Sequence, residues 1–366
     1  MRLKSMVLFF LTLTTVFASS NLPSEKILKQ QIGQMLVVGF DESNVNEHSQ
    51  IVKDIQNYHL GGVILFDRFY TNKTKAKNII NTKQLQILTH RLQTFSQHPL
   101  IISIDQEGGK VQRLKDFNGF KTTKSAQQIA HLSLEEAKNQ YDILAQQLQN
   151  LGINTNFAPV VDLAMNEDNV VIYKLQRSYS KDPLVVTSYA QTFINALHEH
   201  HVLAVLKHFP GHGSSLKDSH KGFVDVSHTW KKIELEPYKK LIQNGNIHMI
   251  MTAHVFNKHL DKLYPATLSY AINTELLRQE LGYKGVLISD DLQMDAILKH
   301  YSLEQTVTLA INSGVDLLLF GNQLAQTDVK MIIDTIYAQV LNKQIEYTKI
   351  QKANERIKQL QQYLKK

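Results

Sequence analysis

Cysteine is missing from this 366-residue sequence. Its absence excludes a disulfide-stapled scaffold, a thiol nucleophile, a cysteine-ligated zinc site and an iron–sulfur cluster. Neither sign of charge dominates, since 40 Lys and Arg stand against 33 Asp and Glu for a net charge of +7. The basic residues are spread along the chain, which argues against a nucleic-acid partner. With 43% apolar and 20% charged residues, the sequence is typical of a folded protein with a large core.

The sequence also lacks an apolar run at its start that is long enough for a membrane span. Residues 6–17 are apolar, but a helix of about a dozen residues is too short to cross a hydrocarbon core of roughly 30 Å. The basic Arg2 and Lys4 precede this run and small residues follow at 18–20, which predicts a secretory signal peptide over residues 1–20. No cysteine follows the run, so a lipoprotein anchor is excluded. We expect export to the periplasm or the exterior, with no stable membrane span after the signal peptide is cleaved. The alternative is that the segment is retained as a membrane tether.

The rest of the chain alternates predicted strands with predicted helices. Short runs rich in Val, Ile, Leu and Phe predict eight strands, at residues 36–40, 62–66, 100–104, 153–157, 202–206, 248–252, 286–289 and 316–320. These runs are apolar throughout rather than alternating, which is typical of parallel strands buried on both faces. Capping boxes at Ser133-Leu-Glu-Glu136 and Ser302-Leu-Glu-Gln305 predict the starts of two intervening helices.

This alternation predicts a single α/β domain of the (β/α)8 TIM-barrel type. We place the catalytic domain at residues 21–343 and expect residues 344–366, which are charged and amphipathic, to form a helix covering the outside of the barrel. A doubly wound open sheet is the structural alternative. No internal repeat or interdomain linker is visible, and a monomer is the default expectation.

Ionisable residues follow most of the predicted strands. Because a TIM barrel carries its chemistry at the carboxyl ends of its strands, these residues are candidates for an active site. They are Asp67, Asp105, Asp162, Lys207 with His208, His254, and Asp290 with Asp291; Asn322 follows the last strand. For Asp67 and Asn322 we favour ordinary loop polarity.

The first candidate segment is Ile104-Asp-Gln-Glu-Gly-Gly-Lys-Val-Gln-Arg113. Its paired glycines let the backbone approach a ligand closely. The order of Gly and Lys differs from that of a phosphate loop, so nucleotide binding is not indicated. The alternative is a structural turn held by an Asp105–Arg113 pair.

The second segment runs from Lys207 to His220 and holds three histidines on a Gly-containing loop. Two alternatives are solvated loop histidines and a metal site made of His208, His212, Asp218 and His220. The Lys207 charge and the Pro-Gly break argue against a metal, and we predict none. On an extended loop the Asp218 and His220 side chains would point the same way. The carboxylate would then fix the tautomer of His220 and raise its pKa, leaving one ring nitrogen for proton exchange with a substrate.

The third segment is Gly285-Val-Leu-Ile-Ser-Asp-Asp-Leu-Gln-Met294. A carboxylate that leaves a buried strand at the barrel mouth is a candidate nucleophile. Side chains alternate along a strand, so we expect one of Asp290 and Asp291 to enter the mouth and the other to cap the following helix. Arg177, in a loop before a helix, predicts nothing by itself.

Together these strings resemble glycoside hydrolase family 3, in particular its single-domain β-N-acetylhexosaminidases. Beside the segments Asp105–Arg113, Lys207–Gly213, Asp218–His220 and Ile288–Leu292, the strings Asn156-Phe-Ala-Pro-Val-Val-Asp162 and Pro265-Ala-Thr-Leu-Ser269 also fit, in the family's order. The resemblance implies that Asp290 is the nucleophile and His220 the general acid/base, assisted by Asp218. It assigns Asp105, Arg113, Arg177, Lys207 and His208 to binding the non-reducing N-acetylglucosamine.

The implied activity is that of a retaining exo-β-N-acetylglucosaminidase acting on peptidoglycan fragments or related glycans, without a cofactor. The alternatives within the family are phosphorolysis in place of hydrolysis, and a β-glucosidase specificity. The alternative from another class is a cell-wall sugar-binding protein without catalysis.

Overall fold

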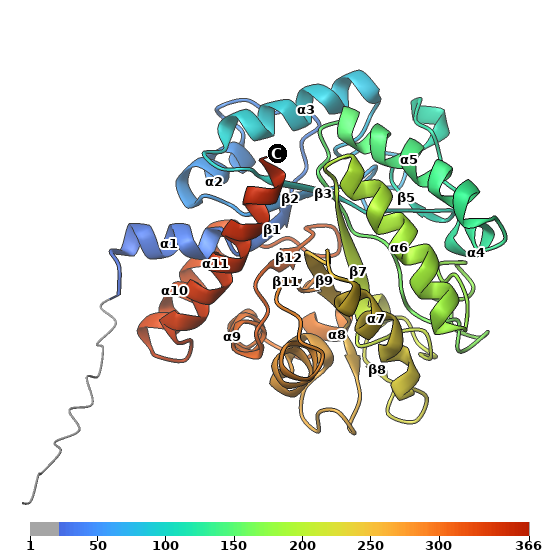
Figure 1. Cartoon of the computed structure of the whole chain (residues 1–366). Coiled ribbons are helices and arrows are strands. Elements are labelled where there is room, and N and C mark those ends of the chain that lie inside the picture. Colours follow the sequence, from blue (N-terminus) through green and yellow to red (C-terminus); the bar gives the residue numbers. More distant parts are fainter. Residues whose placement is uncertain (1–21, 366) are drawn as a thin grey trace, which may run out of the picture.

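Eight parallel strands surround a common core in the computed structural model, which describes residues 22–365 (Figure 1). In barrel order they are β11 (Val286–Ile288), β9 (Met249–Thr252), β7 (Leu203–Phe209), β6 (Thr155–Asn156), β3 (Ile101–Ile104), β2 (Gly62–Leu65), β1 (Leu36–Gly39) and β12 (Leu318–Phe320). A parallel bridge between Ile288 and Leu317 joins the two ends of this order, so the sheet is nearly closed. The predicted barrel is therefore confirmed over the open-sheet alternative. The signal peptide expected at residues 1–20 lies outside the described residues.

Each predicted strand has a counterpart, and its apolar run is buried as the pattern required. All residues of β1, β2 and β3 are buried, for example, because one face fills the barrel interior and the other contacts the helices.

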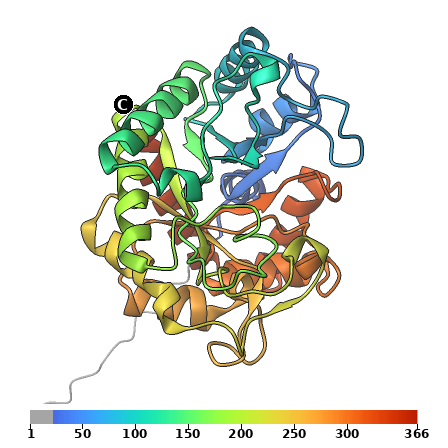
Figure 2. The ribbon, with the colours of Figure 1, turned by 90° about the vertical axis from the view of Figure 1, so that its right-hand side faces the viewer.

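Helices follow the strands and form the outer layer (Figures 1 and 2). This layer contains α1 (Glu25–Gly33), α2 (Gln50–Tyr58), α3 (Thr82–Phe95), α5 (Leu134–Asn150), α6 (Pro183–Glu199), α7 (Glu236–Asn244), the π-helix η5 (Ala271–Glu280), α9 (Leu303–Ser313) and α10 (Val329–Leu341). Both predicted capping boxes are present, at Ser133 before α5 and Ser302 before α9. No helix among residues 22–365 is long and apolar enough to cross a membrane.

The last helix, α11 (Tyr347–Leu364), packs beside α1 and against β11 and α9 (Figure 1). It buries Ile350, Ile357 and Leu360 on one face. Asp316, which precedes β12, accepts hydrogen bonds from Arg356 of α11 at 2.9 Å and from Arg278 at 2.7 Å. A buried carboxylate thus ties the C-terminal helix to the barrel.

We expect Asp316→Ala to lower the free energy of unfolding by about 3 kcal/mol, because removing one partner of a buried pair strands the other charge. Urea unfolding measures the change. Glu199→Ala is the control, since Glu199 pairs with Lys138 on the surface and its loss costs about 1 kcal/mol or less. Equal effects of the two substitutions would contradict the role given to Asp316.

Candidate active site

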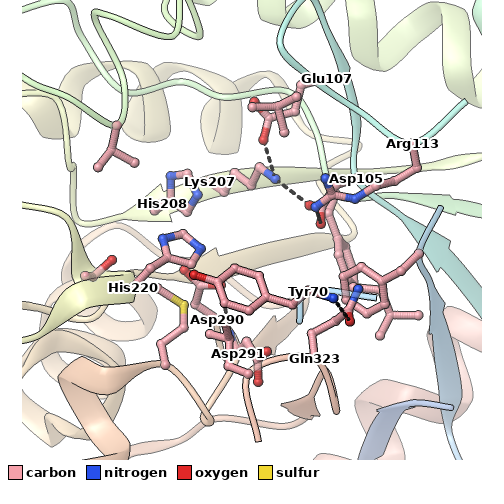
Figure 3. A pocket seen from close by; sticks show the side chains of 18 of the residues that line it. Tyr70, Asp105, Glu107, Arg113, Lys207, His208, His220, Asp290, Asp291 and Gln323 are labelled. Carbon is pink, nitrogen blue, oxygen red and sulfur yellow. Dashed lines mark hydrogen bonds and ion pairs between the residues drawn. The ribbon is translucent and has the colours of Figure 1, made fainter. Parts of the chain in front are cut away.

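A cavity of about 540 Å³ opens at the carboxyl ends of the strands (Figure 3). The structure brings together every site residue predicted from the sequence in its lining, namely Asp105, Arg113, Arg177, Lys207, His208, Asp218, His220 and Asp290. Four parts of the barrel supply them. The first is the hairpin of β4 (Gln106–Gly108) and β5 (Val111–Gln112), together with the residue that joins it to β3, and the second is the long loop after β6. The others are β7 with the loop that follows it and the end of β11.

Charged pairs form one wall of this cavity. Lys207 Nζ lies 2.9 Å from Asp105 Oδ1 and 2.6 Å from Glu107 Oε1. Arg177 binds both oxygens of Glu107, each at 2.7 Å. Arg113 Nη2 donates to Asp105 Oδ2 at 3.0 Å, so the Asp105–Arg113 pair considered as a structural alternative exists and also lines the cavity. We call Asp105, Glu107, Arg113, Arg177 and Lys207 the ion-pair wall.

Glu107 was given no role from the sequence. The signal was available, since Glu107 stands two residues after Asp105 and side chains two apart lie on the same side of an extended segment.

Every member of the ion-pair wall whose pKa is perturbed is shifted toward its charged form. Burial raises the pKa of Asp105, but the charges of Lys207 and Arg113 outweigh burial and hold it well below its usual range. In the same way Arg177 and Lys207 hold the pKa of Glu107 at about 2. Burial lowers the pKa of Lys207, yet Asp105 and Glu107 raise it overall. With three cations and two carboxylates, the wall offers fixed, charge-assisted donors to the oxygens of a polar ligand.

His208 is held by a buried carboxylate. Its Nδ1 lies 2.7 Å from Asp162 Oδ2, and Asp162 also accepts a hydrogen bond from the backbone N–H of His212 at 2.8 Å. Since the carboxylate accepts, we assign the proton to Nδ1 of His208, which leaves Nε2 facing Arg177 at 3.4 Å. Asp162 thereby positions both the strand end and the start of the following loop.

Asp218 and His220 meet, as the sequence predicted. His220 Nδ1 lies 2.8 Å from Asp218 Oδ1, which also accepts from the backbone N–H of His220 at 2.9 Å. The expected extended conformation is wrong, because Asp218 is the N-cap of a 3₁₀ turn, η2 (Ser219–Lys221), and the turn brings the two side chains together. The His220 side chain is half exposed and its Nε2 is left for a ligand in the cavity. Burial lowers the pKa of His220, but the Asp218 hydrogen bond and the Asp290 charge raise it above its ordinary value.

Asp290 and Asp291 are neighbours in different electrostatic surroundings (Figure 3). Burial raises the pKa of Asp290, but the neighbouring imidazoles of His254, His208 and His220 lower it overall, so this carboxylate stays ionised. Burial raises the pKa of Asp291 to about 6.

The side chain of Asp291 has structural partners. Its Oδ1 accepts from the backbone N–H groups of Gln293 at 3.1 Å and Gly321 at 3.0 Å. The expected helix cap is wrong in detail, since the N-cap of α8 (Asp295–Leu298) is Met294. Asp291 instead fixes the turn before α8 and ties it to the end of β12.

The remaining strand-end residues have structural partners too. His254 Nε2 lies 2.9 Å from the Asp291 carbonyl oxygen, which needs a proton on that nitrogen. Asn322 binds Gly39 and Gln293, as ordinary loop polarity predicts, whereas Asp67 pairs with Arg68 and both line the cavity.

Within residues 22–365, no group of three or more His, Asp or Glu side chains is arranged to hold a metal ion.

Comparison with known proteins matches these features to one family. The model of the glycosyl hydrolase family 3 N-terminal domain matches residues 27–360. The beta-hexosaminidase A of Pseudoalteromonas piscicida is 38% identical over 287 residues, which cover 72% of this chain and 46% of that protein. The beta-hexosaminidase of Tolumonas auensis is 35% identical over 273 residues, which cover 73% and 77% of the two chains.

A solved structure of similar fold is the glycoside hydrolase family 3 beta-N-acetylglucosaminidase from Paenibacillus sp.. Its TM-score is 0.84 at 32% sequence identity, with 92% of this chain and 62% of that chain covered. The chain therefore spans less than half of the Pseudoalteromonas relative and less than two thirds of the Paenibacillus structure.

Proposed function

The chain belongs to glycosyl hydrolase family 3, and on that premise we propose that it is a retaining exo-β-N-acetylglucosaminidase. It removes the non-reducing terminal N-acetylglucosamine of peptidoglycan fragments or related glycans. One observation carries this proposal: the Asp290 carboxylate and the His220–Asp218 pair line the same cavity as the ion-pair wall. A carboxylate nucleophile and a protonated acid are the two groups that the first step of glycoside hydrolysis requires.

In the first step, Asp290 attacks the anomeric carbon while His220 gives its Nε2 proton to the leaving oxygen. The glycosidic bond breaks, and an ester between Asp290 and the sugar forms. In the second step, His220 takes a proton from water, and the resulting oxygen nucleophile displaces Asp290 at the anomeric carbon. Two displacements return the β configuration.

The His220–Asp218 pair suits both steps. Histidine titrates near neutral pH, so one imidazole serves as an acid in the first step and a base in the second. Asp218 holds Nδ1 and stabilises the charged ring, in the way a carboxylate orients the histidine of a catalytic triad.

The ion-pair wall and His208 bind the terminal sugar in this proposal. Lys207, Arg113 and Arg177 donate to hydroxyl oxygens, and Asp105 accepts from them. Because each group is already held by its neighbour, little side-chain entropy is lost when the sugar binds. This is the arrangement expected of a site that orients one ring over the nucleophile.

We expect Asp218→Asn to change the pH dependence of kcat/KM. The first step needs His220 protonated, so kcat/KM falls as pH rises through the pKa of His220 in the free enzyme. Removing the Asp218 charge lowers that pKa, and the falling limb moves to lower pH by about one unit. Initial rates between pH 4 and 10 measure the shift, and a limb that stays in place would contradict the pairing.

We also propose that the protein acts outside the cytoplasm as a monomer, on the strength of the N-terminal signal pattern and the barrel's C-terminal helical cover. Fractionation of the producing cells tests the location, and light scattering of the purified protein tests the monomer.

Nitrophenol release from 4-nitrophenyl N-acetyl-β-glucosaminide tests the activity. The corresponding β-glucoside is the matched substrate, and release from it alone would make the protein a β-glucosidase. A rate that requires inorganic phosphate and yields a sugar phosphate would make it a phosphorylase. Folded protein that releases nothing but binds N-acetylglucosamine would support the binding-protein alternative.

A further inference from the structure

The loop after β2 contributes several residues to the cavity lining, among them the aromatic Tyr70. This loop contributes Phe69, Tyr70 and Lys73 to the lining, which also contains the ion-pair wall. Tyr70 is 56% exposed although it belongs to this lining, so its ring stands at the mouth and is not part of the core. In Figure 3 the ring extends from the Gln323 side of the cavity toward the side where His220 lies.

Hydrogen bonds on both sides of Tyr70 fix this loop to the loop after β12. The backbone N–H of Tyr70 donates to Gln323 Oε1 at 3.2 Å, and Gln323 Nε2 donates to the Arg68 carbonyl at 2.8 Å. Lys77, whose side chain is fully buried, donates to the Asn322 carbonyl at 2.6 Å and pairs with Asp41 at 3.1 Å. The Tyr70 backbone is therefore positioned before a ligand binds, which reduces the entropy cost of contact.

The two ends of the cavity differ in chemistry. No side chain of the ion-pair wall is more than 26% exposed, and the wall offers charged hydrogen-bonding groups. The rest of the lining includes Tyr70 together with the apolar Val170 and Leu324, the amide Gln323 and the cation Lys73. Arg68 is paired with Asp67 at 3.0 Å, so its charge is offset locally. The exposed ring of Tyr70 offers an aromatic face that fits the C–H face of a sugar ring.

We propose that Tyr70 forms a leaving-group subsite, in which its ring packs against the second pyranose ring of a β-linked disaccharide. The inference rests on the proposed function. His220 must reach the oxygen between the two sugars, so the leaving sugar lies on the exposed side of His220, away from the buried ion-pair wall. Tyr70 is the exposed aromatic residue of the lining, and Gln323, which also lines the cavity, accepts a hydrogen bond from its backbone N–H.

The test measures kcat/KM for two substrates with three proteins, namely Tyr70→Ala, Tyr70→Phe and the wild type. The first substrate is the β-1,4-linked disaccharide of N-acetylglucosamine, and the second is methyl N-acetyl-β-glucosaminide, whose leaving group has no ring. Tyr70→Ala is expected to lower kcat/KM about tenfold for the disaccharide and less than twofold for the methyl glycoside. Tyr70→Phe keeps the ring and should match the wild type. Tyr270→Ala is the control, because Tyr270 is similarly exposed but lies outside the cavity, under Lys349.

Equal losses on both substrates would place Tyr70 against the terminal sugar and overturn the proposal, and so would no loss on either. A binding experiment keeps this result separate from the proposed catalysis. In the Asp290→Asn protein, Tyr70→Ala should weaken binding of the disaccharide about tenfold by calorimetry and leave the binding of N-acetylglucosamine unchanged. Unchanged disaccharide binding would overturn the subsite even if the protein hydrolyses nothing.

Discussion

Alanine at position 290 is expected to lower kcat on N-acetyl-β-glucosaminides by roughly 10⁴-fold or more, the scale on which loss of a covalent nucleophile acts. Without the carboxylate, no glycosyl-enzyme forms and the positive charge that develops on the sugar ring is not stabilised. Asp290 Oδ1 accepts one hydrogen bond from the neighbouring backbone N–H of Asp291 at 2.8 Å, and losing this local contact should leave the variant folded. Initial rates with 4-nitrophenyl N-acetyl-β-glucosaminide and circular dichroism measure both effects.

Asp291→Asn is the matched control. An amide oxygen can still accept from the backbone N–H groups of Gln293 and Gly321, so we expect less than a tenfold loss of kcat/KM. Added azide should restore activity to Asp290→Ala and yield the α-glycosyl azide, because the small anion enters from the face that Asp290 occupied. A large loss of kcat/KM for Asp291→Asn with little loss for Asp290→Ala would show that Asp291, and not Asp290, is the nucleophile.

Alanine at position 220 is expected to produce losses that depend on the leaving group. A disaccharide leaves as a poor alkoxide and needs the proton from His220, so its kcat/KM should fall roughly 10²–10⁴-fold. A 2,4-dinitrophenyl group leaves without a proton, so formation of the glycosyl-enzyme should change little. Stopped-flow release of dinitrophenol isolates that first step.

The second step gives an independent check on the same residue. His220→Ala should slow the hydrolysis of the glycosyl-enzyme, since no base remains to activate water, and the dinitrophenol trace should become a burst followed by a slow phase. Wild-type protein under the same conditions is the reference. Equal losses for good and poor leaving groups would show that His220 has a structural role only.

The barrel could be predicted because each buried strand leaves a direct signal in the sequence. The runs at 36–40 and 286–289, for example, are apolar on both faces, and capping boxes mark the starts of two of the helices between such runs. The strand-end rule then located Asp105, Lys207 and Asp290 without coordinates. Predicting the strands and these site residues needs only the local sequence pattern and the rule that a TIM barrel carries its active site at the carboxyl ends of its strands.

The rest depends on contacts between distant segments. Glu107 pairs with Arg177, which lies 70 residues further along the chain, and the residues around either one give no sign that the two are partners. The Asp218–His220 contact was predicted from spacing, yet it arises from a 3₁₀ turn and not from an extended loop. Nothing in the sequence places Tyr70 over the cavity, because its position is set by hydrogen bonds to a loop more than 250 residues away.

The proposed mechanism requires that Asp290 becomes covalently bonded to the sugar. Mass spectrometry of the His220→Ala protein, quenched with acid during turnover of 2,4-dinitrophenyl N-acetyl-β-glucosaminide, tests it most directly. We expect a gain of one N-acetylglucosaminyl residue, located by fragmentation on Asp290. A modified Asp291, or turnover of the substrate with no covalent adduct at any time, would contradict it.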